Sequence, residues 1–275
     1  MSGALVLVGT PIGNLGDLSE RAIAELGRAD VVACEDTRRT GKLLAHIGVR
    51  APQLRVVNDH TEARVVHDVL GRLERGERVA VVTDAGMPGI SDPGERLVAA
   101  AAAAGHPVEV VPGPSAAIAA LVLSGLAAGR FVFEGFLPRK GSGRSERLAA
   151  VAEERRTVVL YEAPHRMART LTDLAAVCGP SRRVAIAREL TKLHEEVWRG
   201  SLDAAVERSV EVEPRGEHVI VLDGAPPPAE VDDAAILEAV QRARAAGEST
   251  RDAATEVAEA LGVPRRRVYG LATGG

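Results

Sequence analysis

The chain has 275 residues, of which 46% are hydrophobic, so it can bury a sizeable core and is not disordered as a whole. Only 2% of the residues are aromatic, so aliphatic side chains and alanine must fill that core. This scarcity argues against RNA binding by stacking of bases on a sheet of aromatic rings. With a net charge of −4, any polyanionic partner must be met by local basic patches and not by the overall field.

Cysteine usage and the N-terminal sequence indicate a soluble protein of the cytoplasm. Cys34 and Cys178 lie far apart and form no CxxC pair, as expected in a reducing compartment. The apolar run at residues 4–8 follows no basic segment and does not resemble a signal peptide. No apolar stretch is long enough to span a bilayer, so we expect no membrane contact.

In the first 115 residues, short β-branched runs alternate with longer helical patterns. The expected strands are Leu5–Val8, Val31–Ala33, Leu54–Val57, Val79–Thr83 and Val108–Val111. The expected helices between them are Ser19–Gly27, Arg38–His46, Thr61–Glu74 and Gly94–Ala104. This alternation predicts a first α/β domain, residues 1–115, with a parallel sheet covered by helices on both faces.

A second α/β domain is expected over residues 116–224. It begins where Pro112-Gly113-Pro114 breaks the pattern and Ser115 offers an N-cap to an alanine-rich helix. The expected strands are Phe131–Glu134, Thr157–Tyr161, Val184–Ala187, Glu195–Trp198 and His218–Leu222, and the expected helices are Arg144–Arg155, His165–Cys178 and Ser201–Glu207. The later strands follow one another closely, which predicts a mixed sheet.

A small helical tail is expected over residues 230–275, after a stiff proline-rich linker at residues 225–229. Its expected helices are Asp233–Ala246, Thr250–Leu261 and Pro264–Ala272. The turn before the last helix and the basic run that follows it form a helix-turn-helix outline. Such a tail either contacts nucleic acid, packs on the rest of the chain or dimerises.

Three loops rich in glycine and proline follow expected strands, at residues 9–17, 84–94 and 112–116. In an open parallel sheet, ligands bind at the carboxyl ends of the strands, where such loops gather. The chain contains no GxxxxGK[ST] loop, and Gly9-x-x-x-Gly13-x-x-Gly16 is not a GxGxxG fingerprint. We therefore expect a ligand with little or no phosphate, such as an adenosyl group carrying a sulfonium and an amino-acid tail.

The sequences of these loops, and of several later segments, closely resemble those of one family. The matching segments are Gly9–Asp17, Glu35–Arg38, Thr83–Gly86 with Pro88–Gly94, Pro112–Ala117, Phe133–Pro138, Tyr161–Arg166 and Ala187–Lys192. Together they resemble the small-subunit rRNA methyltransferase I family, within the tetrapyrrole (corrin/porphyrin) methylase superfamily. The resemblance runs in order from residue 3 to about residue 223. It implies the two-domain α/β fold of that superfamily, a parallel-sheet domain followed by a mixed-sheet domain.

The resemblance also implies an activity, a cofactor and partners. The activity is S-adenosylmethionine-dependent 2′-O-methylation of a cytidine in 16S rRNA. The implied enzyme is a homodimer that acts on this rRNA within the assembled small ribosomal subunit. The donor would lie in the cleft between the two domains. The residues implied for donor binding are Pro11, Asp84, Ala85, Gly86, Met87, Pro88, Ser91, Ser115 and Ala116. Met87 stands where relatives usually carry threonine.

Transfer of a methyl group to a ribose hydroxyl calls for a base or an orienting cation, because this hydroxyl is a poor nucleophile. The candidates are Glu35, Asp36, Arg38, Glu189 and Lys192. Acidic residues after a strand are as often helix caps as bases, so the choice among the five stays open. The seven histidines show no metal-ligand spacing, and no metal is predicted.

Two basic segments are candidates for contact with RNA phosphates: Arg139, Lys140, Arg144 and Arg147 in the second domain, and Arg265, Arg266 and Arg267 in the tail. The alternative for each is a solvated helix face. Two other functions remain open at this point: methylation of a tetrapyrrole, and a role as a non-catalytic ribosome-assembly factor. Gly86-Met87-Pro88 replaces the Gly-Asp-Pro typical of tetrapyrrole enzymes, which disfavours the first.

Overall fold

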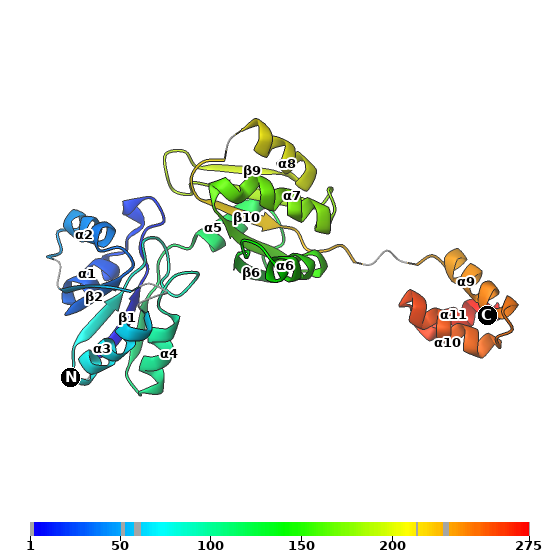
Figure 1. Ribbon diagram of the computed structural model, residues 1–275, viewed down its shortest axis with the longest axis horizontal. Helices are drawn as coiled ribbons and strands as arrows, with labels where there is room; N and C mark the ends of the chain where they lie inside the picture. Colours follow the sequence, from blue (N-terminus) through cyan, green and yellow to red (C-terminus); the bar gives the residue numbers. More distant parts are fainter. Residues whose placement is uncertain (1–2, 51–52, 58–61, 213, 228–230, 275) are drawn as a thin grey trace. The chain divides into compact units, whose positions relative to one another are not determined.

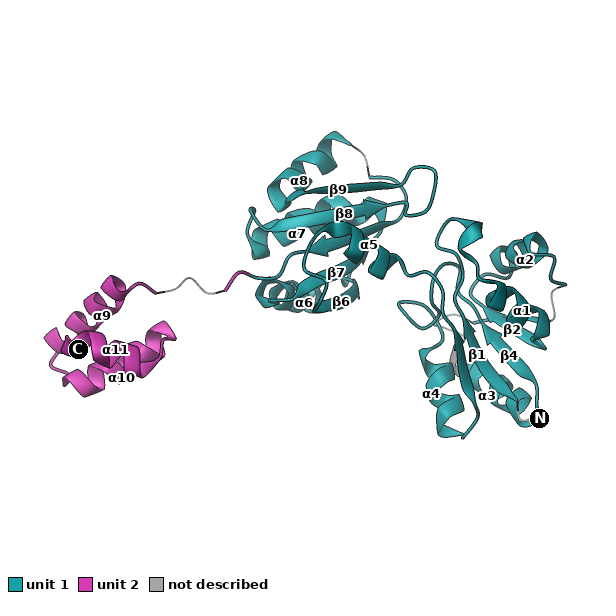
Figure 2. Cartoon of the chain, turned by 180° about the vertical axis from the view of Figure 1, so that it is seen from behind, with its two compact units in different colours: residues 1–225 teal, residues 226–275 magenta. Residues whose placement is uncertain are grey.

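The computed structural model describes residues 3–50, 53–57, 62–212, 214–227 and 231–274 (Figure 1). The chain forms two compact units, residues 1–225 and 226–275 (Figure 2). The first unit contains two five-stranded sheets. Within the described residues, no helix is long and apolar enough to cross a membrane.

The first sheet is fully parallel, as the sequence predicts. Its strands run in the order β3-β2-β4-β1-β5. They are β1 (Ala4–Val8), β2 (Val31–Cys34), β3 (Gln53–Val56), β4 (Arg78–Val81) and β5 (Val108–Val111). Because β1 and β4 are neighbours at the centre and β5 lies next to β1, the loops that follow these three strands emerge side by side.

Helices cover both faces of this sheet. The helices are α1 (Glu20–Arg28), α2 (Thr37–His46), α3 (Glu62–Glu74) and α4 (Glu95–Ala103). Leu26 of α1 and Leu44 of α2 pack with alternate strand residues such as Val6, whereas Leu73 of α3 and Leu97 of α4 pack on the opposite face. Burial of both faces explains why the strands read as continuous apolar runs.

The second sheet is mixed, with the strand order β6-β7-β10-β8-β9. Its elements are β6 (Phe131–Phe136), β7 (Thr157–Glu162), β8 (Arg183–Arg188), β9 (Glu196–Ser201) and β10 (His218–Leu222). Only β6 and β7 pair in parallel; the other three pairs are antiparallel. The predicted mixed sheet is confirmed, and the short loop between β8 and β9 is what an antiparallel arrangement permits.

The two faces of the second sheet are covered unequally. The apolar helix α5 (Ala116–Ser124) packs on one face through Ala117, Ala120 and Leu121. The other face carries α6 (Ser142–Glu153), α7 (Met167–Cys178) and α8 (Leu202–Glu211). Ile12, from the loop after β1, is buried in the cluster on the α5 face, so a residue of the first domain belongs to the core of the second.

The second unit consists of three helices around its own small core. They are α9 (Asp233–Ala245), α10 (Thr250–Leu261) and α11 (Arg265–Thr273). Ile236, Val240, Val257 and Val268 are buried together. Gly262, in the left-handed conformation with φ +63°, ends α10 and makes the turn that the helix-turn-helix outline requires. Residues 228 and 229 of the expected linker, and residue 230 of the expected tail, lie outside the described residues.

The ends of several elements differ from the prediction. The expected helix Arg144–Arg155 is α6, which begins at Ser142 after Gly141 and ends at Glu153. It stops there because Glu154 adopts an extended backbone and its carboxylate accepts from the backbone and side chain of Arg156. The expected helix at His165 starts as a 3-10 turn over Pro164–Arg166, and α7 follows from Met167.

Candidate active site

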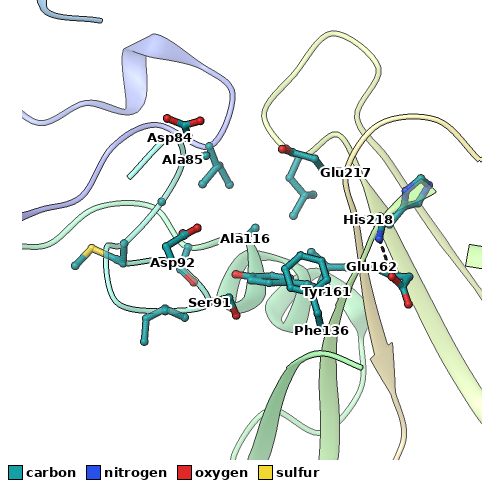
Figure 3. A pocket seen from close by; sticks show the side chains of 18 of the residues that line it. Asp84, Ala85, Ser91, Asp92, Ala116, Phe136, Tyr161, Glu162, Glu217 and His218 are labelled. Atoms are coloured by element: carbon teal, nitrogen blue, oxygen red, sulfur yellow. Dashed lines mark hydrogen bonds between the residues drawn. The ribbon is translucent and has the colours of Figure 1, made fainter. Parts of the chain in front are cut away.

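The three glycine- and proline-rich loops meet at a cavity of about 370 Å³, called the loop cavity below. Figure 3 shows Asp84 and Ala85 on one side of it and Glu217 and Tyr161 on the other. Its volume lies at the lower end of the range of about 300–1,000 Å³ found for small-molecule sites. Residues of both sheets therefore build one binding site.

Two glycines let the first and third loops touch. A Cβ placed on Gly113 would lie 2.8 Å from the Cα and carbonyl carbon of Gly9, and one on Gly9 would lie 2.6 Å from the Cα of Gly113. Both neighbours are backbone atoms, which cannot turn aside. Glycine at these two positions is therefore a requirement of the close approach between the loops.

The first loop is also tied to the second. Thr10 and Gly86 form a two-residue antiparallel bridge with backbone distances of 2.9 and 3.1 Å. The buried Thr10 hydroxyl donates to the carbonyl of Thr83 at 3.1 Å. Gly86 has φ +87°, a conformation that favours glycine. These contacts hold the backbone of residues 84–86 against the cavity.

Met87 closes the contact between the second and third loops. The backbone N–H of Gly113 donates to Sδ of Met87, with an N–S distance of 3.3 Å. The thioether is a weak acceptor, but it fills the space beside Gly9 and Gly113 and lines the loop cavity. A side chain longer than threonine therefore has a defined packing role at this position.

Two carboxylates and a guanidinium lie at one end of the loop cavity. Glu35 and Asp84 both line it, and Nη1 of Arg39 lies 3.3 Å from Oδ2 of Asp84. Burial, together with the charge of Asp84, raises the pKa of Glu35, which also accepts from the Thr83 hydroxyl. Burial likewise raises the pKa of Asp84. Two nearby carboxylates with raised pKa values are suited to proton transfer.

Asp36 and Arg38, also expected near the chemistry, lie outside this cluster. The Asp36 carboxylate caps α2 by accepting from the backbone N–H of Arg38 at 2.8 Å, and it pairs with the Arg38 guanidinium. These bonds hold the pKa of Asp36 well below its usual range. Neither residue lines the loop cavity or the neighbouring cavity described below. Their catalytic role stays a prediction, and in this structure the Asp36 carboxylate serves as a helix cap.

The segment Glu189–Lys192 approaches the site from the second domain. A Cβ on Gly13 would meet Cγ of Lys192 at 2.5 Å, and the backbone N–H of Asn14 donates to the Thr191 hydroxyl at 3.0 Å. Nζ of Lys192 lies 3.0 Å from Glu189 and 2.8 Å from Glu217. Glu189 and Thr191 have φ +50° and +65°, so the segment is held in a backbone conformation that costs free energy.

A second cavity of about 320 Å³ adjoins the loop cavity; it is called the α2 cavity below. Lys192 lines the α2 cavity. Glu189 lines neither cavity, but it pairs with Lys192 and accepts from the backbone N–H of Glu217, which lines both. The two cavities share the residues Ile12, Arg39, Asp84, Ala85 and Glu217.

Most residues expected at the donor lie in the loop cavity. Those that line it are Asp84, Ala85, Gly86, Met87, Ser91, Ser115 and Ala116. Pro11 instead lines the α2 cavity, and Pro88 lines neither. Pro88 immediately precedes Gly89, which has φ +84°, a backbone conformation that favours glycine.

Several wall residues escaped the sequence analysis. Phe136 and Tyr161 line the loop cavity with their ring centroids 5.5 Å apart. Arg39 and Glu217 line both cavities. Tyr161 lies in a segment that resembles the family, so that resemblance was the available signal. Arg39 and Glu217 gave no such signal, because their roles depend on which elements meet in space.

Glu162 and His218 border the cavity, but their side chains belong to the other face of the sheet. They pair across β7 and β10, in line with Leu160 and Ile220 of the opposite core (Figure 3). The Glu162 carboxylate accepts from the Thr170 hydroxyl at 2.6 Å and pairs with Arg166. Burial lowers the pKa of His218. Both side chains are structural in this arrangement.

Arg144 is a correction to the predicted RNA-binding set. Its side chain is only 5% exposed, and it donates to Asp173, to the carbonyl of Pro138 and to the Thr170 hydroxyl. A phosphate cannot reach a guanidinium so enclosed. The residue faces inward because it lies in line with Leu148 and Val151 on the buried side of α6.

The other basic candidates remain at the surface. Arg139 and Lys140 are exposed, and Arg147 is exposed and pairs with Glu134. In the second unit, Arg265 and Arg266 are exposed at the start of α11. Arg267 pairs with Asp233 at 2.8 Å and donates to the carbonyl of Val231, which ties α11 to the start of α9.

Replacing Arg144 by alanine is expected to destabilise the protein by roughly 3 kcal/mol, because it strands the Asp173 carboxylate and two other acceptors. Chemical unfolding of the variant would measure this change. Arg139→Ala is the control, because Arg139 is exposed, and it should change the stability by less than about 0.5 kcal/mol. An unchanged stability of Arg144→Ala would contradict the structural role.

Comparison with known proteins places the chain in a family. Residues 4–206 match the family described as Tetrapyrrole (Corrin/Porphyrin) Methylases. The chain is 45% identical over 271 residues to a protein of Synechocystis sp. named ribosomal RNA small subunit methyltransferase I, covering 98% of this chain and 97% of the relative. It is 49% identical over 272 residues to the protein of the same name from Mycobacterium bovis, covering 98% and 94%.

A solved structure shares the fold. Uroporphyrin-III C-methyltransferase from Thermus thermophilus, complexed with S-adenosyl homocysteine, has a TM-score of 0.57 at 22% identity, covering 81% of this chain and 97% of that one. The predicted two-domain fold is therefore confirmed. With identities well above 40% over nearly the full length, the chain belongs to the ribosomal RNA small subunit methyltransferase I family of the tetrapyrrole methylases, and its methyl donor is S-adenosylmethionine.

Proposed function

We propose that this methyltransferase transfers the methyl group of S-adenosylmethionine to the ribose 2′-hydroxyl of a cytidine in 16S rRNA. One observation carries the proposal: the cavity formed by the three loops opens beside a pair of carboxylates, Glu35 and Asp84, and beside a second cavity. The names of the relatives support rRNA as the acceptor. The resemblance of the loop motifs supports the position on the ribose.

The loop cavity fits the donor. Oδ1 of Asp84 is buried and, among the described residues, has no hydrogen-bond partner, so it can accept from an ammonium or hydroxyl group. Ala85, Gly86 and Ala116 present short side chains, which let a ligand reach the backbone amides and carbonyls. The bound donor supplies an activated methyl group, and the loops supply a fixed position for it.

We assign the role of base to Glu35. It lines the cavity, and its pKa is raised towards neutral pH. A carboxylate with a higher pKa is a stronger base for the proton of the ribose hydroxyl. Thr83 holds it through a hydrogen bond, with 3.4 Å between the oxygens. Asp84 is already paired with Arg39, so its carboxylate is better suited to hold the donor. Lys192, bonded to Glu189 and Glu217, is a cation that can orient the acceptor.

We place the RNA body on the exposed basic residues Arg139 and Lys140, and on Arg265 and Arg266 of the tail. Lys140→Glu is expected to weaken binding of 16S rRNA by about tenfold or more at low salt, since one phosphate contact becomes repulsive. Donor binding, measured by calorimetry, should be unchanged because Lys140 does not line the loop cavity. Equal loss of rRNA and donor binding would contradict this placement.

The resemblance also supports a homodimer that acts on the assembled small subunit in the cytoplasm. In the single chain, α5 exposes an apolar face, with Ile118 47% and Val122 71% exposed. An uncovered patch of this kind marks an interaction surface. We propose that a second copy of the chain contributes to covering it.

The alternative acceptor is a tetrapyrrole, since relatives in fold act on such rings. To separate the two, the protein is incubated with methyl-labelled donor and either small subunits, naked 16S rRNA or a precorrin, and the label is mapped. Label on a cytidine ribose supports the proposal. Label on the precorrin, or on no acceptor, overturns it.

A further inference from the structure

One face of α2 carries a row of three basic side chains and one leucine. Arg39, Lys42, Leu43 and His46 are spaced by three, four and seven residues, so they lie along one side of the helix. All four line the α2 cavity. This helix follows β2 and the Glu35 segment, and the row therefore begins next to the carboxylate cluster of the active site.

The opposite wall of the α2 cavity is different in character. It is formed by the first loop through Pro11, Ile12 and Leu15, with Lys192 from the second domain. Leu15 is 46% exposed, although it is a large apolar side chain. Apart from Lys192 this wall is apolar, whereas the wall formed by α2 carries three basic side chains.

The α2 cavity adjoins the loop cavity, which is the proposed site of the donor. It shares Ile12, Asp84 and Ala85 with the loop cavity, and Arg39 spans both. A group seated in the α2 cavity would therefore have one edge beside the methyl donor and beside Glu35. Its volume of about 320 Å³ is that of a small-molecule site and not of a packing defect.

The basic side chains of α2 are of two kinds. Arg39 is held by Asp84, with 3.3 Å between Nη1 and Oδ2, so it is oriented by the active site itself. Lys42 and His46 are exposed at the outer part of the row, and within the described residues neither forms an ion pair. An ammonium and an imidazole in this position can donate to a phosphate oxygen without giving up another partner.

We propose that the α2 cavity holds the acceptor nucleotide of the RNA, with its ribose beside Asp84 and Glu35 and a flanking phosphate on Lys42 and His46. The apolar wall of Pro11, Ile12 and Leu15 takes the face of the base. The inference rests on the proposed function and goes beyond it by naming where the acceptor binds and which side chains read its backbone.

The test uses the full-length protein with methyl-labelled donor and small ribosomal subunits, comparing Lys42→Gln, His46→Gln and the double variant with wild type. The matched control is Arg155→Gln, which removes a charge from an exposed residue outside both cavities. For Lys42→Gln we expect KM for the subunit to rise about tenfold, and the slope of log K against log salt to fall by about 0.7–0.9, as for one lost phosphate contact. Donor affinity should stay at the wild-type value.

The outcomes separate the two levels of the argument. If wild type labels no RNA, the proposed function fails. If wild type labels a cytidine ribose but Lys42→Gln and the double variant match Arg155→Gln in KM and salt slope, the α2 cavity is not the acceptor site. Loss of donor affinity in Lys42→Gln would also overturn the inference, whereas restoration of the wild-type KM by Lys42→Arg supports it.

Discussion

Replacing Glu35 by glutamine is expected to lower kcat by about 10²–10⁴-fold, the usual contribution of a positioned base, while the donor still binds. The amide keeps the size of the side chain and its contact with Thr83, but it cannot take a proton from the ribose hydroxyl. Single-turnover methyl transfer to small subunits, with donor affinity measured separately, would give the two quantities.

The pH profile provides a second readout. Transfer requires Glu35 in its ionised form, and burial together with Asp84 raises its pKa. The wild-type rate should therefore fall as the pH is lowered through that raised pKa, at a higher pH than for an ordinary glutamate. Glu35→Gln should lack this limb of the profile. The acid limb surviving unchanged in the variant would assign the titration to another group.

Asp36→Asn is the matched control, since it makes the same chemical change one residue along the chain. Asp36 lines neither cavity and serves as the N-cap of α2, a role that asparagine also fills. We expect kcat within a few-fold of wild type and a small loss of stability. A loss as large as that of Glu35→Gln would contradict the assignment of the base.

Replacing Gly113 by alanine is expected to reduce donor affinity by about ten- to hundredfold. The new Cβ would lie 2.8 Å from two backbone atoms of Gly9, so the first and third loops must separate. Overpacking of this kind costs about 1–3 kcal/mol, and about 1.4 kcal/mol is a factor of ten in affinity. The separation would also break the contact of the Gly113 N–H with Met87. Calorimetric titration with the donor would measure the loss.

Gly41→Ala is the control for that substitution. Gly41 lies within α2, and a Cβ there meets no atom within 4 Å. Alanine should stabilise the helix by about 0.5–1 kcal/mol and leave donor affinity unchanged. If both variants bind the donor like wild type, the contact between Gly9 and Gly113 does not hold the site together.

The sequence predicted the architecture well because burial leaves a local pattern. Strands buried on both faces, such as β1 and β4, read as apolar runs, and helices such as α1 repeat with helical spacing. The mixed order of the second sheet followed from the short spacing of its strands. Helix ends were less accurate, as at Glu153, because a side chain of the next turn decides where the helix stops.

The site was only partly predictable, for a physical reason. Loops that touch the ligand through glycine and backbone carry their signal in the local sequence, as for Ala85 and Gly86. Arg144 was misplaced because a charged residue on a helix is expected to face solvent unless its partner, here Asp173, is known. Arg39 was missed because only the turn at the start of α2 shows that Arg39 lines the loop cavity, while Asp36 caps the helix.

Ile12 has a consequence for how the molecule unfolds. Its side chain, from a loop of the first sheet, is 7% exposed in the core of the second sheet. Separating the two sheets would expose this side chain to water at a cost in free energy. Each sheet therefore stabilises the other, although the strand pattern alone would predict two independent domains. In thermal or chemical unfolding, we expect residues 1–225 to unfold in one cooperative transition. The three-helix tail has its own core and should unfold in a separate transition.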